Sequence, residues 1–134
     1  MYTEANETIE KMKLVRLRED LASKLQTMTV TLQDLRQRAD QQSGDIVTES
    51  NTVSTSIGDI NDTLVRTQSV NNDPSDLEDK RDLEINRLAQ LIDIRFFKRD
   101  DGDIVVFTSG GRTLVDSVPG VLTHNSASTV SATI

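Results

Sequence analysis

The chain has 134 residues, of which 35% are hydrophobic and 3% aromatic, with three Phe, one Tyr and no Trp. This composition excludes a thick globular core and an aromatic-lined ligand pocket, and it favours helices that pack along a thin line of contact. Fifteen basic and 22 acidic residues give a net charge of −7, which argues against nucleic acids and anionic membrane surfaces as partners. The absence of cysteine removes disulfides, thiolate metal sites and cysteine nucleophiles.

The N-terminal segment, Met1 to Glu7, is acidic and lacks the basic start and apolar stretch of a cleaved signal peptide. No apolar run exceeds about five residues, so the sequence predicts no segment that crosses a bilayer. Three expectations stay open on this evidence. The protein stays inside the cell, it leaves by a route that needs no cleaved signal, or the sequence is a piece of a longer protein.

The first half of the chain has a helical period. Apolar residues recur at alternating steps of three and four residues, at Leu21, Leu25, Met28, Leu32, Leu35 and Ala39. This spacing places their side chains on one stripe of a helix. The same stripe extends back to Leu14 and forward to Leu64, which predicts one helix from Asn6 to Arg66.

The middle of this predicted helix is weak. Gly44 and Gly58 each cost about 1 kcal/mol against Ala in a helix interior. Residues 41–52 also contain Ser, Thr and Asn in place of better helix formers. We predict a continuous but locally soft helix, and the alternative is a break at Gly44.

A second helix is predicted after a polar linker at residues 68–72. Asp73 can act as the cap, Pro74 fits the first helical position, and Asp76 places negative charge in the first turn. The helix continues to Ile92, with apolar residues at Leu77, Leu88, Leu91 and Ile92, supported by Ile85 or Leu83. Because the linker is short, we expect this helix to run back antiparallel and to cover the first helix only near residues 53–64.

The pattern changes to strands after the second helix. Residues 94–99 and 103–108 are rich in β-branched and aromatic residues and flank the turn Asp100-Asp101-Gly102, which predicts a β-hairpin. Ser109-Gly110-Gly111 predicts a second turn, and residues 112–115 a short third strand.

The predicted fold class is therefore α+β: a long helix, a short antiparallel return helix, and a small antiparallel β region. We expect an elongated helical domain at residues 1–93 and the start of a β domain at residues 94–134. From Asp116 on, the sequence has no compact hydrophobic pattern. That tail is either disordered or consists of strands whose partners lie elsewhere.

The apolar stripe from Leu14 to Leu35 has no predicted cover. It is on the order of 30 Å long, and the second helix reaches only about 25 Å along the far end of the first. Either copies of the chain associate through this stripe, or the helix that covers it lies in sequence outside these residues.

His124 is the only histidine, which removes most general-base and metal constellations. A nucleophile–base pair with Ser126 or Ser128 can be drawn, but the surrounding sequence is polar and predicts no pocket. We interpret His124 as a solvated loop residue.

The run Asp100-Asp101-Gly102-Asp103 invites comparison with a calcium-binding loop. With Gly102 at the sixth loop position, Phe97 and Arg99 fall where oxygen ligands belong, and Thr108 replaces the bidentate Glu. The run therefore predicts a plain hairpin turn in which Gly102 supplies a positive φ.

Two further segments are interpreted as structural. Gly110-Gly111 is a turn, since no Lys-Ser/Thr follows to make a phosphate-binding loop. The charged cluster is interpreted as the solvated face of a helix, with a charged interaction surface as the alternative; its members are Asp76, Glu78, Asp79, Lys80, Arg81 and Asp82. We expect no catalytic, metal or cofactor-binding residue, no cofactor and no enzymatic activity.

An ordered series of short motifs follows the linker. Residues 72–82 match the pattern N-D-x-x-D-L-x-D-x-R-D. They are followed by Leu91-Ile92-Asp93-Ile94, by the turn at residues 100–102, and by the run Val106-Phe107-Thr108-Ser109-Gly110-Gly111-Arg112-Thr113-Leu114-Val115. In this order the motifs resemble those of the flagellar hook-associated protein 1 (FlgK) family. Residues 32–40 and 57–61 also resemble parts of the long helix of that family. The resemblance covers residues 19–115 and does not clearly include residues 1–18.

The resemblance implies a structural role rather than a catalytic one. Proteins of this family form a ring of subunits between the flagellar hook and the next junction protein, with long helices along the filament axis. The implied partners are neighbouring copies, the hook protein and that junction protein. The implied location is extracellular, on the bacterial flagellum, after export without a cleaved signal peptide. The chain is then a middle segment, and the helix that covers the stripe from Leu14 to Leu35 lies outside it.

An alternative function stays open from the residues alone. The chain is then an unrelated secreted or phage-type coiled-coil stalk or adaptor, which forms a trimer through the stripe from Leu14 to Leu35.

Overall fold

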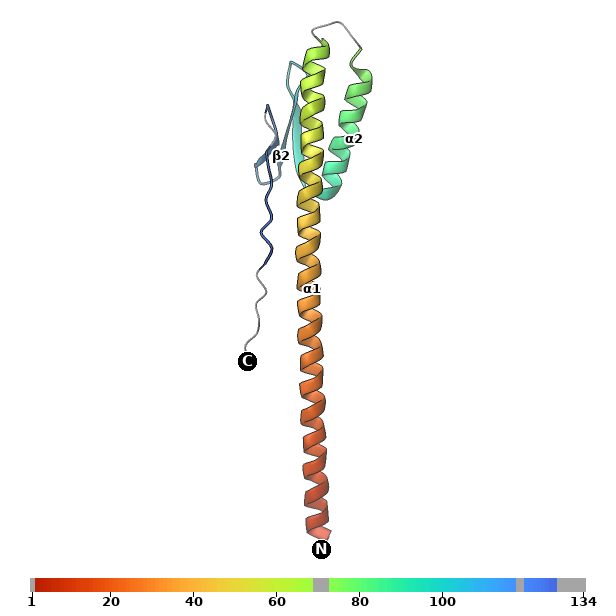
Figure 1. Cartoon of the computed structure of the whole chain (residues 1–134), viewed down its shortest axis with the longest axis vertical. Helices are drawn as coiled ribbons and strands as arrows, with labels where there is room; N and C mark the ends of the chain where they lie inside the picture. Colours follow the sequence, from red (N-terminus) through yellow and green to blue (C-terminus); the bar gives the residue numbers. More distant parts are fainter. Residues whose placement is uncertain (1, 69–72, 118–119, 128–134) are drawn as a thin grey trace. The chain divides into compact units, whose positions relative to one another are not determined.

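The computed structural model describes residues 2–68, 73–117 and 120–127. Helix α1 spans Tyr2–Gln68, α2 spans Ser75–Leu91, and the strands are β1 (Ile94–Lys98), β2 (Ile104–Thr108) and β3 (Thr113–Val115). These elements confirm the predicted α+β class (Figure 1). The chain divides into two compact units, Met1–Gln41 and Gln42–Ile134.

Helix α1 is continuous through Gly44, so the predicted uninterrupted helix is confirmed and the alternative break is not observed. It begins four residues before and ends two residues after the predicted bounds. Threonines of α1 donate their hydroxyl protons to the carbonyl four residues earlier, at Thr48, Thr52, Thr55, Thr63 and Thr67. These bonds satisfy polar side chains that otherwise disfavour a helix.

Helix α2 begins at Ser75, one residue later than predicted, and Pro74 takes the N-cap position in place of the first helical position. Pro74 already has helical dihedral angles, with φ −84° and ψ −3°, and its carbonyl accepts from the amides of Leu77 and Glu78 at 3.0 Å. The Asp73 carboxylate accepts hydrogen bonds from the backbone N–H of Ser75, at 3.0 Å, and from its hydroxyl. The prediction of Asp73 as the cap is therefore off by one residue: Pro74 holds the N-cap position and makes no side-chain cap hydrogen bond, and Asp73 precedes it. The predicted linker began at Gln68, but Gln68 is the last residue of α1, and the rest of the linker prediction, residues 69–72, lies outside the described residues.

The contact between Asp73 and Ser75 predicts a pH dependence. The Ser75 hydroxyl and then its backbone N–H hold the pKa of Asp73 below its ordinary value. A carboxyl whose pKa is lowered by folding stabilises the fold above its unfolded pKa, and that stabilisation is lost as the pH falls through the folded pKa. We expect urea unfolding at neutral pH to find Asp73→Ala less stable than the wild type, with the difference shrinking in acid. A difference that grows in acid would contradict this assignment, and Ser75→Ala should bring the pKa of Asp73, followed by NMR, back toward its ordinary value.

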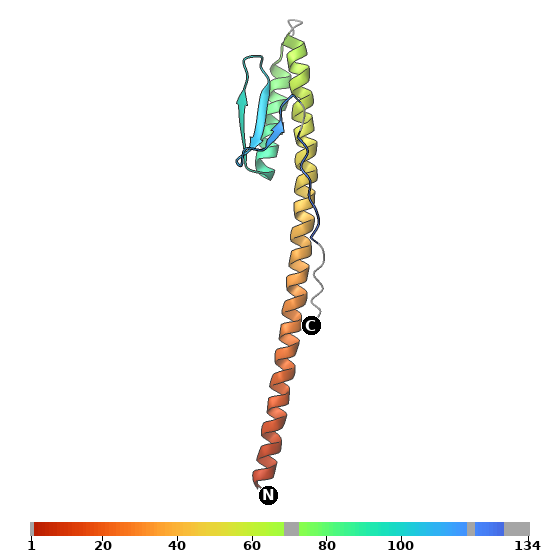
Figure 2. The same ribbon diagram turned by 90° about the vertical axis from the view of Figure 1, so that its left-hand side faces the viewer.

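The three strands form an antiparallel sheet in the order β1-β2-β3, joined by two turns of the same geometry (Figure 2). In the first turn, Gly102 donates to the Arg99 carbonyl and Arg99 donates to the Asp103 carbonyl. In the second, Gly111 and Thr108 make the corresponding bonds. Both glycines have φ of 86°, which side chains with a Cβ rarely adopt, so the predicted turns and the role of Gly102 are confirmed.

The core of the second unit joins both helices and the sheet. Its buried members are Val53, Ile57, Ile85, Leu88, Ile104, Val106, Leu114 and Val115. Helix α2 runs back beside the last turns of α1, as both ribbon views show, and it contributes Ile85 rather than the exposed Leu83 (Figures 1 and 2). The predicted antiparallel return and the cover near residues 53–64 are thereby confirmed.

After β3, the described residues 116–117 and 120–127 contain no helix or strand. Leu122 is partly buried and packs against the core of the second unit. The remaining predictions for the tail, at residues 118–119 and 128–134, lie outside the described residues.

Candidate functional site

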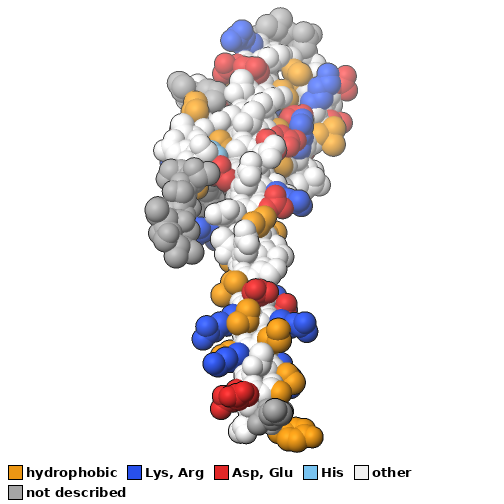
Figure 3. Space-filling model, turned by 60° about the horizontal axis from the view of Figure 1, so that its bottom comes forward, with side chains coloured by type: hydrophobic (Ala, Val, Ile, Leu, Met, Phe, Trp, Pro, Cys, Tyr) orange, Lys and Arg blue, Asp and Glu red, His pale blue; other side chains and the backbone are white. Residues whose placement is uncertain are grey.

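The first unit presents an apolar stripe on one face of α1. Its side chains are 50–60% exposed: Leu14, Leu21, Leu25, Met28, Leu32 and Leu35. The lower part of Figure 3 shows apolar side chains interspersed with basic and acidic ones. The second unit buries the continuation of this helical pattern, since Val53, Ile57 and Leu64 are at most 1% exposed. The first-unit part of this helical pattern is therefore exposed and available for packing against another helix.

A buried polar junction holds α1, α2 and the first hairpin together. Arg81 of α2 is 2% exposed, and its Nη1 donates to the Asn61 side-chain oxygen at 3.1 Å and to the Gly102 carbonyl at 2.8 Å. Burial lowers the pKa of Arg81, and the nearby carboxylates of Glu78, Asp82 and Asp103 partly offset this by raising it. An arginine remains cationic at neutral pH even so, and the neighbouring oxygens stabilise its charge.

Asn61 of α1 completes this junction. Its amide nitrogen donates to the Ile104 carbonyl at 2.8 Å, and its oxygen accepts from the Ile104 N–H at 3.4 Å. One side chain therefore satisfies both backbone groups of the first residue of β2, as a neighbouring strand would. This pairing fixes the position of β2 along the axis of α1.

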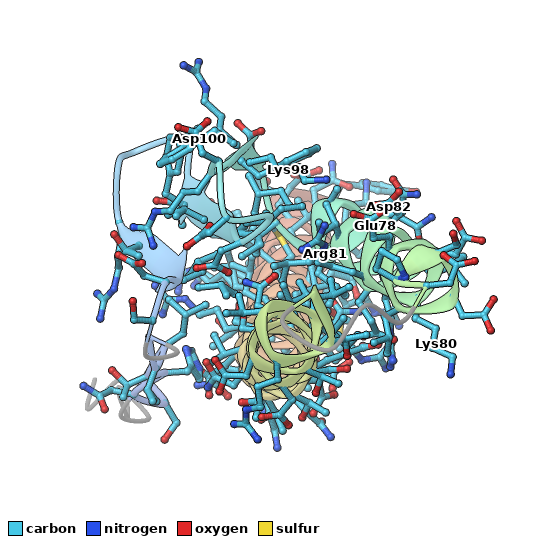
Figure 4. All side chains as sticks on the ribbon, turned by 90° about the horizontal axis from the view of Figure 1, so that it is seen from above. Glu78, Lys80, Arg81, Asp82, Lys98 and Asp100 are labelled. Carbon is cyan, nitrogen blue, oxygen red and sulfur yellow. The ribbon has the colours of Figure 1, made fainter. Side chains whose placement is uncertain are left out.

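Ion pairs surround the junction toward solvent. Figure 4 shows Glu78 and Arg81 of α2 with Lys98 of β1 nearby, and Lys98 Nζ lies 3.0 Å from Glu78 Oε1. Arg99 bridges Asp103 at 3.3 Å and Asp116 at 2.8 Å. The backbone N–H of Ser117, together with Arg99, holds the pKa of Asp116 below its ordinary value. The pairs Lys98–Glu78 and Arg99–Asp116 are partly exposed, so they join the first hairpin to α2 and to the segment after β3 but contribute little stability each.

The structure corrects the interpretation of the charged cluster at residues 76–82. Asp76, Asp79, Lys80 and Asp82 are exposed as predicted, but the prediction is wrong for Arg81, which is buried. Arg81 precedes Ile85 by four residues and Leu88 by seven, so it lies on the buried face of α2. That spacing indicates a buried position for Arg81, but the charges of the neighbouring residues favoured an exposed one. The same signal marks Asn61, four residues after Ile57 and three before Leu64.

The other residues considered for chemistry are not assembled into a site. His124 and Ser126 are exposed in the segment after β3, and Ser128 lies outside the described residues. The oxygens of Asp101 and Asp103 serve the hairpin, because Asp101 accepts from the Asp103 N–H and Asp103 pairs with Arg99. Within the described ranges, no group of three or more His, Cys, Asp or Glu side chains is arranged to hold a metal ion. No helix in the described part of the chain is long and apolar enough to cross a membrane.

Comparison with known proteins identifies this architecture. Residues 2–133 match the family model described as the helical domain of the flagellar hook-associated protein FlgK. The match includes residues 2–18, which the motifs alone did not connect to this family. No curated protein sequence matches the chain significantly.

Among solved structures, the chain is similar to the flagellar hook junction protein FlgK from Burkholderia pseudomallei, with 33% sequence identity and a TM-score of 0.59. The similarity covers 63% of this chain and 14% of that protein, so the chain corresponds to a small part of its relative. These matches decide against an unrelated stalk protein. The chain belongs to the family of the FlgK flagellar hook-associated helical domain.

Proposed function

We propose that the chain is the helical part of a structural subunit at the junction between the flagellar hook and filament, and that it acts by helix packing. The observation that carries this proposal is the stripe on the first unit, where six apolar side chains in helical register are at least half exposed. A helix that carries such an exposed apolar stripe is only marginally stable in water unless another helix covers the stripe. Family membership supplies the flagellar setting.

The charges beside the stripe indicate which kind of helix fits it. In a heptad, Leu21, Met28 and Leu35 fall at one core position, and the positions that flank the core include Lys24, Arg36 and Arg38 and no acidic residue. Arg38 pairs with Asp34 of the same helix at 2.9 Å, so Lys24 and Arg36 supply the charge beside the stripe. Parallel copies of this segment would therefore gain no attraction from their flanks. The surface is complementary to an apolar helix face with acidic flanks.

The partners and location follow from the same proposal. The subunit contacts neighbouring copies in a ring, the hook protein and the next junction protein. It acts outside the cell on the flagellum, after export without a cleaved signal peptide. No step of this function requires a reactive group, so we propose that the chain is not an enzyme. We also propose that residues 1–93 serve as the elongated helical domain and residues 94–134 as the start of a β domain in the longer protein.

The substitution Leu32→Asp tests the role of the stripe. It places a charge at the middle of the packing surface, and Leu32 is not among the residues that form the core of the second unit. We expect bacteria that carry this change in the full-length protein to assemble hooks but few filaments, as counted by electron microscopy. In the isolated chain, we expect light scattering to show loss of self-association or partner binding, while NMR shows the two hairpins still folded.

Leu83→Asp is the matched control, because Leu83 is also exposed but lies on α2 outside the stripe. Filament assembly should be normal in this variant. Normal assembly with Leu32→Asp, or an equal defect in both variants, would overturn the proposed packing surface.

A further inference from the structure

The segment at residues 120–127 lies alongside α1 (Figure 2). Asn51 of α1 makes two hydrogen bonds with it. The Asn51 amide nitrogen donates to the Leu122 carbonyl at 2.8 Å, and its oxygen accepts from the Leu122 N–H at 2.8 Å. Asn51 thus pairs with one residue of an extended backbone in the same way that Asn61 pairs with Ile104.

The start of the segment is attached to the sheet. Gly120 donates its N–H to the Leu114 carbonyl at 2.8 Å, and a Cβ at this position would lie 2.5 Å from the Thr113 oxygen, so a side chain does not fit. Arg112 adds a weaker bond from Nη2 to the Val121 carbonyl at 3.3 Å. These contacts direct the chain from β3 onto α1.

The part of α1 beneath the segment is lined by small and medium side chains. Gly44, Val47 and Asn51 follow one another at steps of four residues or fewer and share one face of the helix, where each is only partly exposed. A Cβ built on Gly44 would lie 3.5 Å from the His124 ring carbon Cδ2, an ordinary contact. Gly44, which weakens the helix by its propensity, therefore lies next to His124 of the segment.

The side chains of this segment are less buried than those of the sheet. Within residues 120–127, Leu122 is partly buried against the core, whereas Val121 and residues 123–127 are exposed. Ile104, by contrast, is buried and belongs to a strand with neighbours on both sides. A segment with few buried contacts opens at a lower free energy than the core to which it is attached.

We propose that residues 120–127 form a strap that Asn51 holds on α1, and that this strap opens and closes without unfolding the sheet. When the strap opens, the face of α1 at Gly44, Val47 and Asn51 becomes accessible. The Asn51 side-chain amide then presents one donor and one acceptor, spaced to pair with the C=O and N–H of one residue in an extended chain. That face is a docking site for extended backbone, and its occupant is this chain's own segment at Leu122.

Amide hydrogen exchange measured by NMR on the complete chain tests the strap. In the wild type, the Leu122 amide should exchange at least tenfold faster than the Leu88 amide in the core of α2. In Asn51→Ala, exchange at Leu122 should rise at least tenfold further, while Leu88 changes less than twofold. Asn51→Asp keeps the acceptor, so protection at Leu122 should fall less than in Asn51→Ala.

Thr52→Ala is the matched control, since Thr52 is an exposed neighbour whose hydroxyl bonds only to the Thr48 carbonyl. It should leave exchange at Leu122 unchanged. Equal exchange at Leu122 and Leu88 in the wild type would show that the segment opens only with the core, which overturns the proposal. Unchanged protection at Leu122 in Asn51→Ala would show that Asn51 does not hold it.

Discussion

Arg81→Ala is expected to destabilise the second unit by about 3 kcal/mol. The substitution removes the donor to Asn61 and to the Gly102 carbonyl at a site that water does not reach. A buried acceptor left unpaired carries its full desolvation cost, and the missing side chain also leaves a cavity. Urea unfolding followed by circular dichroism measures the change.

Two variants separate the causes of this effect. Lys80→Ala removes a neighbouring positive charge from the exposed face of α2 and should change stability by less than about 0.5 kcal/mol. Arg81→Met refills most of the volume without donors and should fall between the wild type and Arg81→Ala. A loss below about 1 kcal/mol for Arg81→Ala would mean that the junction does not hold the hairpin against the helices.

Ile57→Ala is expected to cost about 3 kcal/mol, because Ile57 is fully buried where α1 contacts α2 and the sheet. The loss combines the transfer free energy of the deleted carbons with the cavity that remains. The same measurement of urea unfolding applies, and the slope of the unfolding free energy with urea should not change.

Leu25→Ala provides the comparison within the same helix. Leu25 is 54% exposed, so its truncation should change the stability of the isolated chain by less than about 0.5 kcal/mol. In the presence of a helix that packs on the stripe, the cost of Leu25→Ala should rise toward that of Ile57→Ala. Equal costs for the two substitutions in the isolated chain would show that the first-unit stripe is already covered.

Much of the fold was predictable because its signals are local. The three- and four-residue spacing of Leu21 to Leu35 places side chains on one face of a helix whatever surrounds it. Pro74 and Asp73 mark the start of α2, and Gly102 marks a turn, because each favours one backbone conformation within a few residues. The sequence also predicted that the second helix would cover residues 53–64 and leave the stripe exposed, since its length limits its reach.

The polar contacts that hold the elements together were not predictable in this way. The charges around Arg81 favoured a solvated interpretation, and only its position relative to Ile85 and Leu88 pointed inward. The pairing of Asn61 with Ile104 joins residues 43 positions apart, and Asn51 and Leu122 are 71 positions apart.

The sequence by itself determined the helices, the turns and the exposed stripe, because helical period and turn preference depend on neighbours within about one or two turns of chain. Only the tertiary structure decided which polar side chains are buried. A side chain such as Arg81 gains its hydrogen bonds from Asn61 and Gly102, and these groups meet only when α1, α2 and the first hairpin have packed. The free energy of burying such a group depends on whether these hydrogen-bond partners come together in the folded chain. No local sequence pattern specifies those partners.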